Sequence, residues 1–461
     1  MQSKDNTRIF SGASPSEVME DLQPLVNFQE EGISVENLNQ MLDERLLPHL
    51  MKYNHPGFLS MFNDIPEDGA MIGAKLALEY NQGVTDWYVS PGGAMLEELC
   101  VKALCSLFRL EAGSDGTFMY SGTYANQEAL YLALHWKAEQ EGFDFAKEGL
   151  KGFEHPEKLV VLTSFDAHFS LKHAVRMLGL GEKNLITLNV DSNRRIDILQ
   201  LQKSVNQLQE THDIFCVVAT TGTTSTGSID NVLELSKLCQ RIGAWLHVDG
   251  AYGLAYSLVP EYRDRFFGIE FADSVSWDPH KQFGIPIPNS ILFVRRKEDF
   301  NRMSLRSDYI YREGESVPSP GLKSPPSTRP FSALSLVTSI KFQGISKIQE
   351  RLRSPLQAIE TIYNSLKSDL EIELCNEPET GILCFRILNK HISEDQMNDF
   401  LKEIYEEVIT SGKHSISFTK LDDKVVLRLV AITPTSAETL MTTITYVKEK
   451  AELVASRGLQ S

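Results

Sequence analysis

The sequence predicts a doubly wound α/β fold whose central sheet is mostly parallel. Short apolar runs recur between residues 158 and 296. Each run is continuously apolar, whereas a strand with one exposed face would alternate apolar and polar residues. Such runs are typical of parallel strands that are buried on both faces. Helical stretches separate these runs, and strand–helix alternation is the pattern of an α/β domain. The expected strands are 158–164, 184–190, 214–220, 244–249 and 290–296.

The helices expected between these strands are 124–139, 168–178, 197–209 and 230–242. Residues 1–85 also have a helical pattern, which is broken by segments such as NHPGF at 54–58. We therefore expect this region to form an N-terminal arm and not a separate domain. After a proline-rich loop at 312–328, the chain resumes a helical pattern at 331–366. The final part predicts a smaller α+β domain, with strands at 380–388 and 424–432, a helix at 393–410 and a last helix from about 435.

Composition excludes several classes of function. The chain has 461 residues and a formal net charge of −17, whereas phosphate backbones are bound by basic faces, so we expect no nucleic-acid partner. The first residues are polar and no run of 18 apolar residues occurs, so we expect neither a signal peptide nor a membrane partner. The six cysteines are scattered without the spacing of a zinc site. We therefore expect reduced thiols, no bound metal and a cytoplasmic location.

Polar residues gather where the expected strands end. Open parallel sheets bind ligands outside the carboxyl ends of their strands. The polar residues at those ends are Asp166, His168, the segment 221–228, Asp249, Asp278, His280 and Lys281. In addition, Ser121, Gly122 and Thr123 precede a helix, where free backbone N–H groups form an anion site.

Each of these features alone has an ordinary explanation as a helix cap, a loop histidine, a turn aspartate or a surface lysine. Together they describe one ligand, pyridoxal 5′-phosphate. Its phosphate would lie on the helix start at 122–123, and its ring under His168. Its protonated ring nitrogen would pair with Asp249, and its aldehyde would form a Schiff base with Lys281. A cationic ring accepts electrons from a bond broken at the substrate's α-carbon, and a partly neutral amine is nucleophilic.

The sequence resembles the pyridoxal phosphate-dependent group II amino acid decarboxylases, which include aromatic amino acid, glutamate and cysteine sulfinate decarboxylases. The likeness covers roughly residues 50–350. The matching segments are HPGFLSMF (55–62), SPGGAMLEEL (90–99), SGTYAN (121–126), DAHFSLKHA (166–174), ATTGTTSTGSIDN (219–231), HVDGAYG (247–253) and DPHK (278–281).

The resemblance implies a role for each matched residue. Lys281 would be the Schiff-base lysine, Asp249 the partner of the pyridine nitrogen and His168 the stacking histidine. His280 would help to place the phosphate or relay protons, which makes Lys281, His168 and His280 the expected catalytic set. The expected cofactor-binding set is Gly122, Thr123, His168, Thr223, Asp249, Ala251, Asp278, His280 and Lys281.

The resemblance also implies an architecture and a reaction. The architecture is the fold type I, aspartate aminotransferase-like fold, with an N-terminal arm at 1–89, a cofactor domain at 90–330 and a small α+β domain at 331–461. The arm would pack on a partner subunit of a homodimer whose active sites lie at the interface. The reaction would be decarboxylation of a small L-amino acid to an amine and CO2.

Two departures from the family pattern leave alternatives open. Loop 312–328 contains no tyrosine or histidine where the family carries its proton-donating tyrosine, although Tyr309 and Tyr311 precede it. An aldehyde-forming oxidative deaminase or a carbon–carbon lyase is therefore an alternative, and a catalytically silent cofactor-binding protein is a second. The segment Leu59, Ser60 and Met61 would give the substrate pocket a less aromatic wall.

Overall fold

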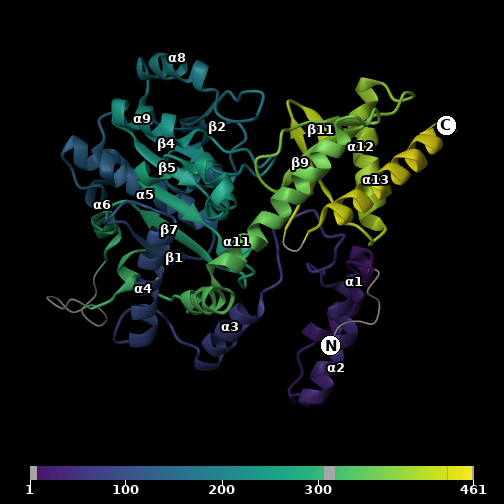
Figure 1. Ribbon diagram of the computed structural model, residues 1–461. Coiled ribbons are helices and arrows are strands. Elements are labelled where there is room, and N and C mark those ends of the chain that lie inside the picture. Colours follow the sequence, from purple (N-terminus) through teal and green to yellow (C-terminus); the bar gives the residue numbers. More distant parts are fainter. Residues whose placement is uncertain (1–7, 306–316, 433–434, 459–461) are drawn as a thin grey trace. The chain divides into compact units, whose positions relative to one another are not determined.

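The computed structural model describes residues 8–305, 317–432 and 435–458 (Figure 1). Within them the chain forms two compact units. The larger unit comprises Asp64–Arg353 and Pro378–Thr380. The smaller unit comprises Ser354–Glu377 and the described residues of Met1–Asn63 and Gly381–Ser461. The predicted division into an arm, a cofactor domain and a C-terminal domain stays a prediction.

The larger unit is built on a seven-stranded sheet. Its strands are β1 (Asp115–Met119), β2 (Leu159–Ser164), β3 (Leu185–Leu188), β4 (Asp213–Thr220), β5 (Trp245–Asp249), β6 (Ser274–Trp277) and β7 (Ser290–Val294). Their order is β1-β7-β6-β5-β4-β2-β3, and only β7 runs antiparallel to its neighbours. The predicted mostly parallel α/β sheet is confirmed.

Strand burial follows the apolar runs of the sequence. Every residue of β2, β5, β6 and β7 is buried, and so is every residue of β4 after its first. β1 lies outside the expected strands, because DGTFM contains no continuous apolar run. Its five residues are nevertheless buried, since β1 pairs with β7 and packs against the helix at 91–107.

The helices of the larger unit connect and cover these strands. They are α3 (Asp68–Tyr80), α4 (Pro91–Leu107), α5 (Gly122–Glu141), α6 (Phe145–Glu148), α7 (Ser170–Met177), α8 (Ile198–Gln209), α9 (Val232–Ile242) and α10 (Pro279–Gln282). α5 begins at the N-cap Ser121, whose side chain accepts a hydrogen bond from the Tyr124 amide. α5 packs against β1, β4, β5, β6 and β7, so its N-terminus is carried to the ends of the central strands (Figure 1).

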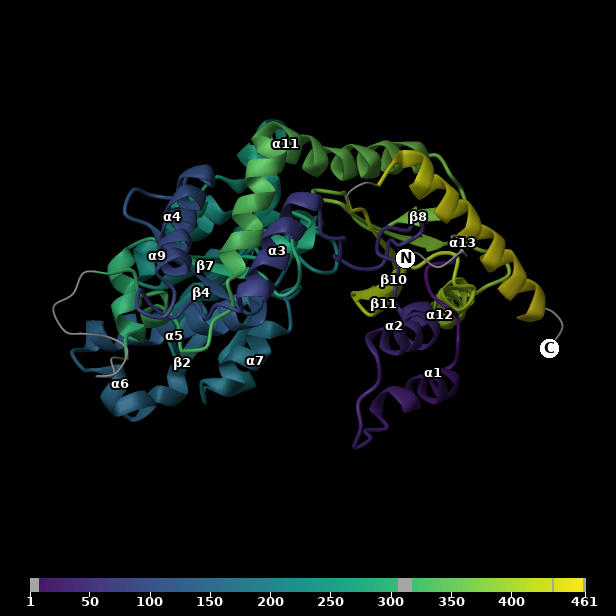
Figure 2. The same ribbon diagram turned by 90° about the horizontal axis from the view of Figure 1, so that it is seen from below.

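A long helix, α11 (Ser332–Leu366), is interrupted at Gly344, where φ is +71° (Figure 2). Glycine adopts this left-handed conformation without the penalty that a Cβ atom brings. The interruption lets one helical segment change direction without a loop.

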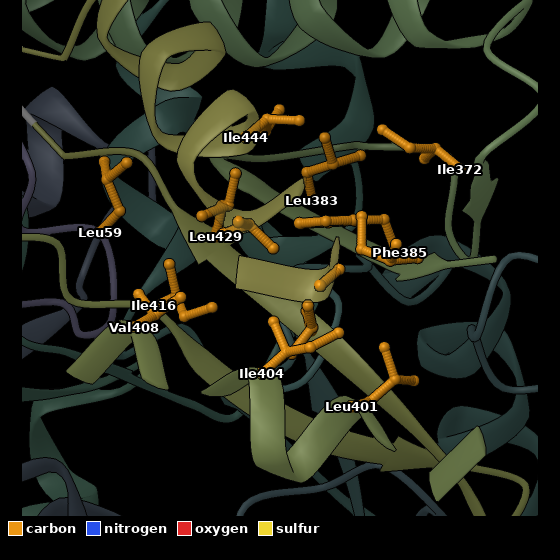
Figure 3. Packing of buried hydrophobic residues seen from close by; sticks show 14 of the residues in the cluster. Leu59, Ile372, Leu383, Phe385, Leu401, Ile404, Val408, Ile416, Leu429 and Ile444 are labelled. Atoms are coloured by element: carbon orange, nitrogen blue, oxygen red, sulfur yellow. The ribbon is translucent and has the colours of Figure 1, made fainter. Parts of the chain in front are cut away.

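The smaller unit contains a second, antiparallel sheet with the order β10-β11-β9-β8. Its strands are β8 (Ile372–Leu374), β9 (Ile382–Ile387), β10 (Ser417–Leu421) and β11 (Lys424–Val430). Its helices are α1 (Pro15–Leu22), α2 (Val35–Arg45), α12 (Glu394–Thr410) and α13 (Ala437–Gly458). Apolar side chains from the sheet, α12 and α13 form one core (Figure 3).

Leu59 belongs to this core and is fully buried among Leu429, Ile416 and their neighbours (Figure 3). The Leu59 amide donates to the Ser415 carbonyl at 2.8 Å, which holds the segment against the sheet. The expectation that Leu59 lines a substrate pocket is therefore wrong, because its side chain packs inside an apolar core. Ser60 is also buried, whereas Met61 is about half exposed.

All six cysteines are free, and five of them are buried. Burial raises the pKa of the Cys100 thiol to about 12. No helix in the described ranges combines the length and the apolar character that crossing a bilayer requires.

Gly253, just beyond β5, tests this packing. A Cβ atom at Gly253 would lie 1.9 Å from the Thr221 carbonyl oxygen, which belongs to fixed backbone. We expect Gly253→Ala to lower the free energy of unfolding of the cofactor-free protein by about 3 kcal/mol, as overpacking of a core does. Urea denaturation measures this change.

The control is Gly32→Ala, because a Cβ atom at Gly32 meets no heavy atom within 4 Å. Equal urea midpoints for Gly253→Ala and the unaltered protein would contradict the described approach of the two loops.

Candidate active site

The ends of β5 and β6 bring three of the predicted residues together. Asp249 is the last residue of β5 and lies opposite Ser276 of β6 in the parallel register. Beyond the strands, the Asp278 amide donates to the Ala251 carbonyl at 3.1 Å. The two loops are thus tied to each other at the carboxyl edge of the sheet, where α/β proteins bind ligands.

Asp249 is a buried carboxylate that is held by hydrogen bonds. Its Oδ2 accepts from Asn126 Nδ2 at 2.8 Å, and its Oδ1 accepts from the Ala251 amide at 3.2 Å and lies 3.4 Å from Ser276 Oγ. In the described part of the chain, the donors that hold this carboxylate are neutral groups. Because a buried carboxylate is costly without a cation, this position favours a positively charged group on a ligand.

Lys281 lies in α10, three residues after Asp278. Its Nζ is 3.1 Å from Asp278 Oδ2, and its backbone amide donates to the Asp278 carbonyl at 3.1 Å. Asp278 is buried and also accepts a hydrogen bond from Ser290 Oγ. The Lys281 side chain is 22% exposed, so the amine is fixed by a buried partner while a ligand can still reach it.

Gly122 marks a close approach of α5 to both loops. A Cβ atom at this position would lie 2.8 Å from Asp278 Oδ2 and 3.3 Å from the Ala251 Cβ atom. A side chain at 122 would therefore displace the carboxylate that holds Lys281. Thr123, the next residue, is partly buried in the first turn of α5, and the N-terminus of a helix favours anions.

His168 joins the same group from the segment before α7. Its Nδ1 accepts from the Ser170 amide at 3.2 Å, and Ser170 Oγ accepts from Asn126 Nδ2 at 2.9 Å. Burial lowers the pKa of His168, and the charge of Asp249 raises it by less. The imidazole is therefore neutral near pH 7, which suits it for packing flat against an aromatic ligand.

His280 faces the backbone of Asn289. Its Nδ1 is 2.5 Å from the Asn289 carbonyl oxygen, and its Nε2 is 3.9 Å from Asp278 Oδ2. Burial lowers the pKa of His280, although the Asp278 charge acts in the opposite direction. His280 thus lies beside the Lys281 anchor.

Thr223 stands apart from this group in its side-chain contacts. It is buried, and its hydroxyl lies 2.9 Å from Thr226 Oγ1 and accepts from the Ser228 amide at 3.1 Å. The link to the site runs through the backbone, since the Thr221 amide donates to the Asp249 carbonyl at 3.0 Å. Tyr309, Tyr311 and residues 312–316 of the loop lie outside the described residues.

The structure adds polar residues to which the sequence assigned no role. His247, in β5, has its Nε2 3.0 Å from Asn126 Oδ1 and its Nδ1 2.9 Å from Ser274 Oγ. Two signals identify these residues in retrospect. His247 and Asp249 are two apart on a strand and share a face, and Asn126 is one helical turn beyond Gly122.

These groups fit the ligand that the sequence predicts. Pyridoxal phosphate presents an aldehyde to an amine, a basic ring nitrogen to a carboxylate and a phosphate to amide groups. The corresponding protein groups are the amine of Lys281, the carboxylate of Asp249, which neutral donors hold, and the start of α5, where Gly122 has no side chain.

Comparison with known proteins identifies relatives along most of the chain. Residues 15–388 match the family model described as the pyridoxal-dependent decarboxylase conserved domain. The L-2,4-diaminobutyrate decarboxylase of Acinetobacter baumannii is 26% identical over 442 residues, which cover 93% of this chain and 86% of that protein. The aromatic-L-amino-acid decarboxylase of Bacillus atrophaeus is 26% identical and covers 92% and 87% of the two chains.

A solved structure shows the same fold. It is the glutamate decarboxylase domain of diaminobutyrate-pyruvate transaminase and L-2,4-diaminobutyrate decarboxylase from Vibrio parahaemolyticus. Its TM-score is 0.87 at 24% identity, and the match covers 96% of this chain and 91% of that one. Because both curated relatives are named decarboxylases, neither an aldehyde-forming or lyase reaction nor a silent cofactor-binding protein is favoured.

The buried imidazole of His247 predicts a loss of stability in acid. Burial lowers the pKa of His247 to about 4, below its ordinary value of 6.5. Since the unfolded chain binds the proton more readily, the stabilising contribution is present above pH 6.5 and is lost as the pH falls toward 4. We expect this residue alone to cost about 2 kcal/mol of unfolding free energy between pH 7 and pH 5.

Urea denaturation of the cofactor-free protein and of its His247 variant at the two pH values measures this cost as the difference between their pH dependences. His247→Gln should remove most of it, whereas His155→Gln, at a half-exposed histidine, should retain it. An unchanged pH dependence in His247→Gln would contradict the neutral, buried state of His247.

Proposed function

Because the chain belongs to the family of pyridoxal-dependent decarboxylases, we propose that it removes the carboxyl group of an L-amino acid as CO2 and releases the amine. The chain is a carboxy-lyase, and its cofactor is pyridoxal phosphate. When bound, this cofactor supplies a ring that accepts the electrons left at the substrate's α-carbon.

The observation that carries the proposal is that one amine and one carboxylate with neutral hydrogen-bond donors lie on two loops that are tied to each other. Lys281 Nζ is held at 3.1 Å by Asp278, whose backbone is tied to the loop that follows Asp249. We propose that Lys281 holds the cofactor's aldehyde as a Schiff base. Asp249 then keeps a proton on the ring nitrogen, because the ligand supplies the cation that the described part of the protein does not.

The remaining residues orient the ligand in this proposal. The neutral ring of His168 stacks on the pyridine, and Ala251 packs against the opposite side. The amides of Gly122 and Thr123, at the start of α5, bind the phosphate together with Asp278 and His280. Thr223 contributes through its loop, whose backbone is bonded to Asp249. His280 also relays protons beside Lys281.

The proposed substrate is an L-amino acid. The curated relatives are named for a diamino acid and for aromatic amino acids, so both classes belong in a substrate panel.

We further propose a homodimer with its active sites at the subunit interface. Both units expose large apolar side chains on their N-terminal segments, which a soluble monomer rarely does over a wide area. Phe28 is 89% exposed in the smaller unit, and Leu78 and Leu99 are 80% and 56% exposed in the larger one. A second copy of the chain is the occupant that this family resemblance favours.

A cytoplasmic location completes the proposal. Its support is the set of six free cysteines, since unpaired thiols are typical of a reducing compartment.

The proposed reaction is tested with the cofactor-loaded protein and a panel of diamino, aromatic, acidic and sulfinic L-amino acids. We expect a visible absorption band from the bound cofactor and, with one class of substrate, amine and CO2 in equal amounts. Lys281→Ala should lose both the band and turnover, because no amine remains to bond the aldehyde. Circular dichroism checks that the variant is folded.

Lys237→Ala is the matched control, since this lysine pairs with Glu234 on α9 and its side chain is 58% exposed. It should keep the band and the activity. A colourless unaltered protein, or aldehyde and ammonia as products, would contradict the proposed reaction.

The proposed dimer is tested by light scattering. We expect twice the mass of one chain, and a lower mass at equal concentration for Leu78→Glu, because a carboxylate would be desolvated in the interface. Leu199→Glu is the control, since Leu199 is 95% exposed on α8. A monomeric unaltered protein that decarboxylates its substrate would rule out the shared active site.

A further inference from the structure

We infer that Asn126 and His247 are positioning residues that aim the Asp249 carboxylate at the cofactor's ring nitrogen without neutralising its charge. The inference rests on the proposed function and adds to it the protein groups behind Asp249. It comes from a buried row of polar side chains on α5, β5 and β6.

The Asn126 side chain is the centre of this row. Its Oδ1 is 3.0 Å from both His247 Nε2 and Ser276 Oγ, and its Nδ2 donates to Asp249 Oδ2 at 2.8 Å and to Ser170 Oγ at 2.9 Å. The residue is 1% exposed. An amide has two donor hydrogens and two acceptor lone pairs, so Asn126 uses its whole hydrogen-bonding capacity here.

The far end of the row is compatible with one direction for each hydrogen bond. The indole of Trp245 only donates, and its Nε1 is 2.9 Å from Ser274 Oγ, which must accept. The hydroxyl hydrogen of Ser274 remains free to be directed to His247 Nδ1 at 2.9 Å. In that arrangement a neutral His247 carries its proton on Nε2 and donates it to Asn126 Oδ1.

The near end of the row requires the same direction. A carboxylate only accepts, so Asn126 must turn Nδ2 toward Asp249. A flipped amide would place its oxygen against Asp249 Oδ2 and its NH2 group against His247 Nε2. The carboxylate thus selects one orientation of Asn126, in which Oδ1 accepts from His247 Nε2, and burial favours the neutral imidazole that this orientation needs.

This arrangement leaves the charge of Asp249 available. A lysine or arginine in place of Asn126 would pair with the carboxylate and weaken its attraction for a protonated pyridine. A neutral amide fixes one carboxylate oxygen by a hydrogen bond and keeps the negative charge for the ligand. The row therefore strengthens the contact between Asp249 and the ring nitrogen.

A purely structural role would be the satisfaction of buried polar groups, and a pair of ligands separates the two roles. Pyridoxal phosphate and its 1-deaza analogue, in which a CH group replaces the ring nitrogen, share the aldehyde and the phosphate. The measured quantity is the ratio of their dissociation constants, analogue over cofactor, for the cofactor-free protein. This ratio reports only the contact with the ring nitrogen.

We expect the unaltered protein to bind the cofactor more tightly than the analogue. Asn126→Ala and His247→Leu should lower the ratio about tenfold, as the loss of a hydrogen bond to a charged group does. His247→Gln should keep most of the ratio, because its side-chain amide can still donate to Asn126. The control Asn376→Ala removes another buried asparagine, in the smaller unit, and should leave the ratio unchanged.

Equal weakening of both ligands in Asn126→Ala and His247→Leu, with an unchanged ratio, would overturn the inference and leave a structural role. If Asn126→Ala does not fold by circular dichroism, the comparison of His247→Leu with His247→Gln decides. An unaltered protein that binds the two ligands equally would instead contradict the proposed role of Asp249 itself, which separates that failure from failure of the inference.

Discussion

A carboxylate that is removed from water must be compensated, and at Asp249 the compensation comes from neutral hydrogen-bond donors. This constraint requires α5 to cross close to β5 and β6, because Asn126 projects from the first turns of that helix. The same crossing brings the N-terminus of α5 against the loop that carries Lys281. The buried charge of Asp249 thus depends on the path of α5 and on the pairing of β5 with β6, and the same packing places Lys281.

The second carboxylate, Asp278, has a different kind of partner. It forms an ion pair with Lys281 and accepts from Ser290 Oγ, so its charge is balanced inside the chain. The difference between the two carboxylates follows from their neighbours, since Lys281 is three residues after Asp278 in the same short helix. A site with one balanced and one unbalanced carboxylate can hold its own amine and still attract a cationic ring.

The sequence predicts the central strands and the residues at their ends because both depend on local pattern. Continuous apolar runs identify β2, β4 and β5, and the polar residues that follow such runs include Asp249 and Lys281. Other features depend on partners distant in the chain. β1 is buried only because β7 pairs with it, and Leu59 enters the core of the smaller unit through its bond to Ser415. Asn126 is one polar residue among many until the sheet places it beside Asp249.

The six buried or partly buried thiols have a practical consequence. Their inaccessibility, and the raised pKa of thiols such as Cys100, leave little reactive thiolate in the native chain. Alkylating reagents can modify these sulfurs chiefly when the surrounding helices and strands separate. The native cysteines therefore serve as internal reporters of local opening in both units, and mass spectrometry can follow them one by one without an added label.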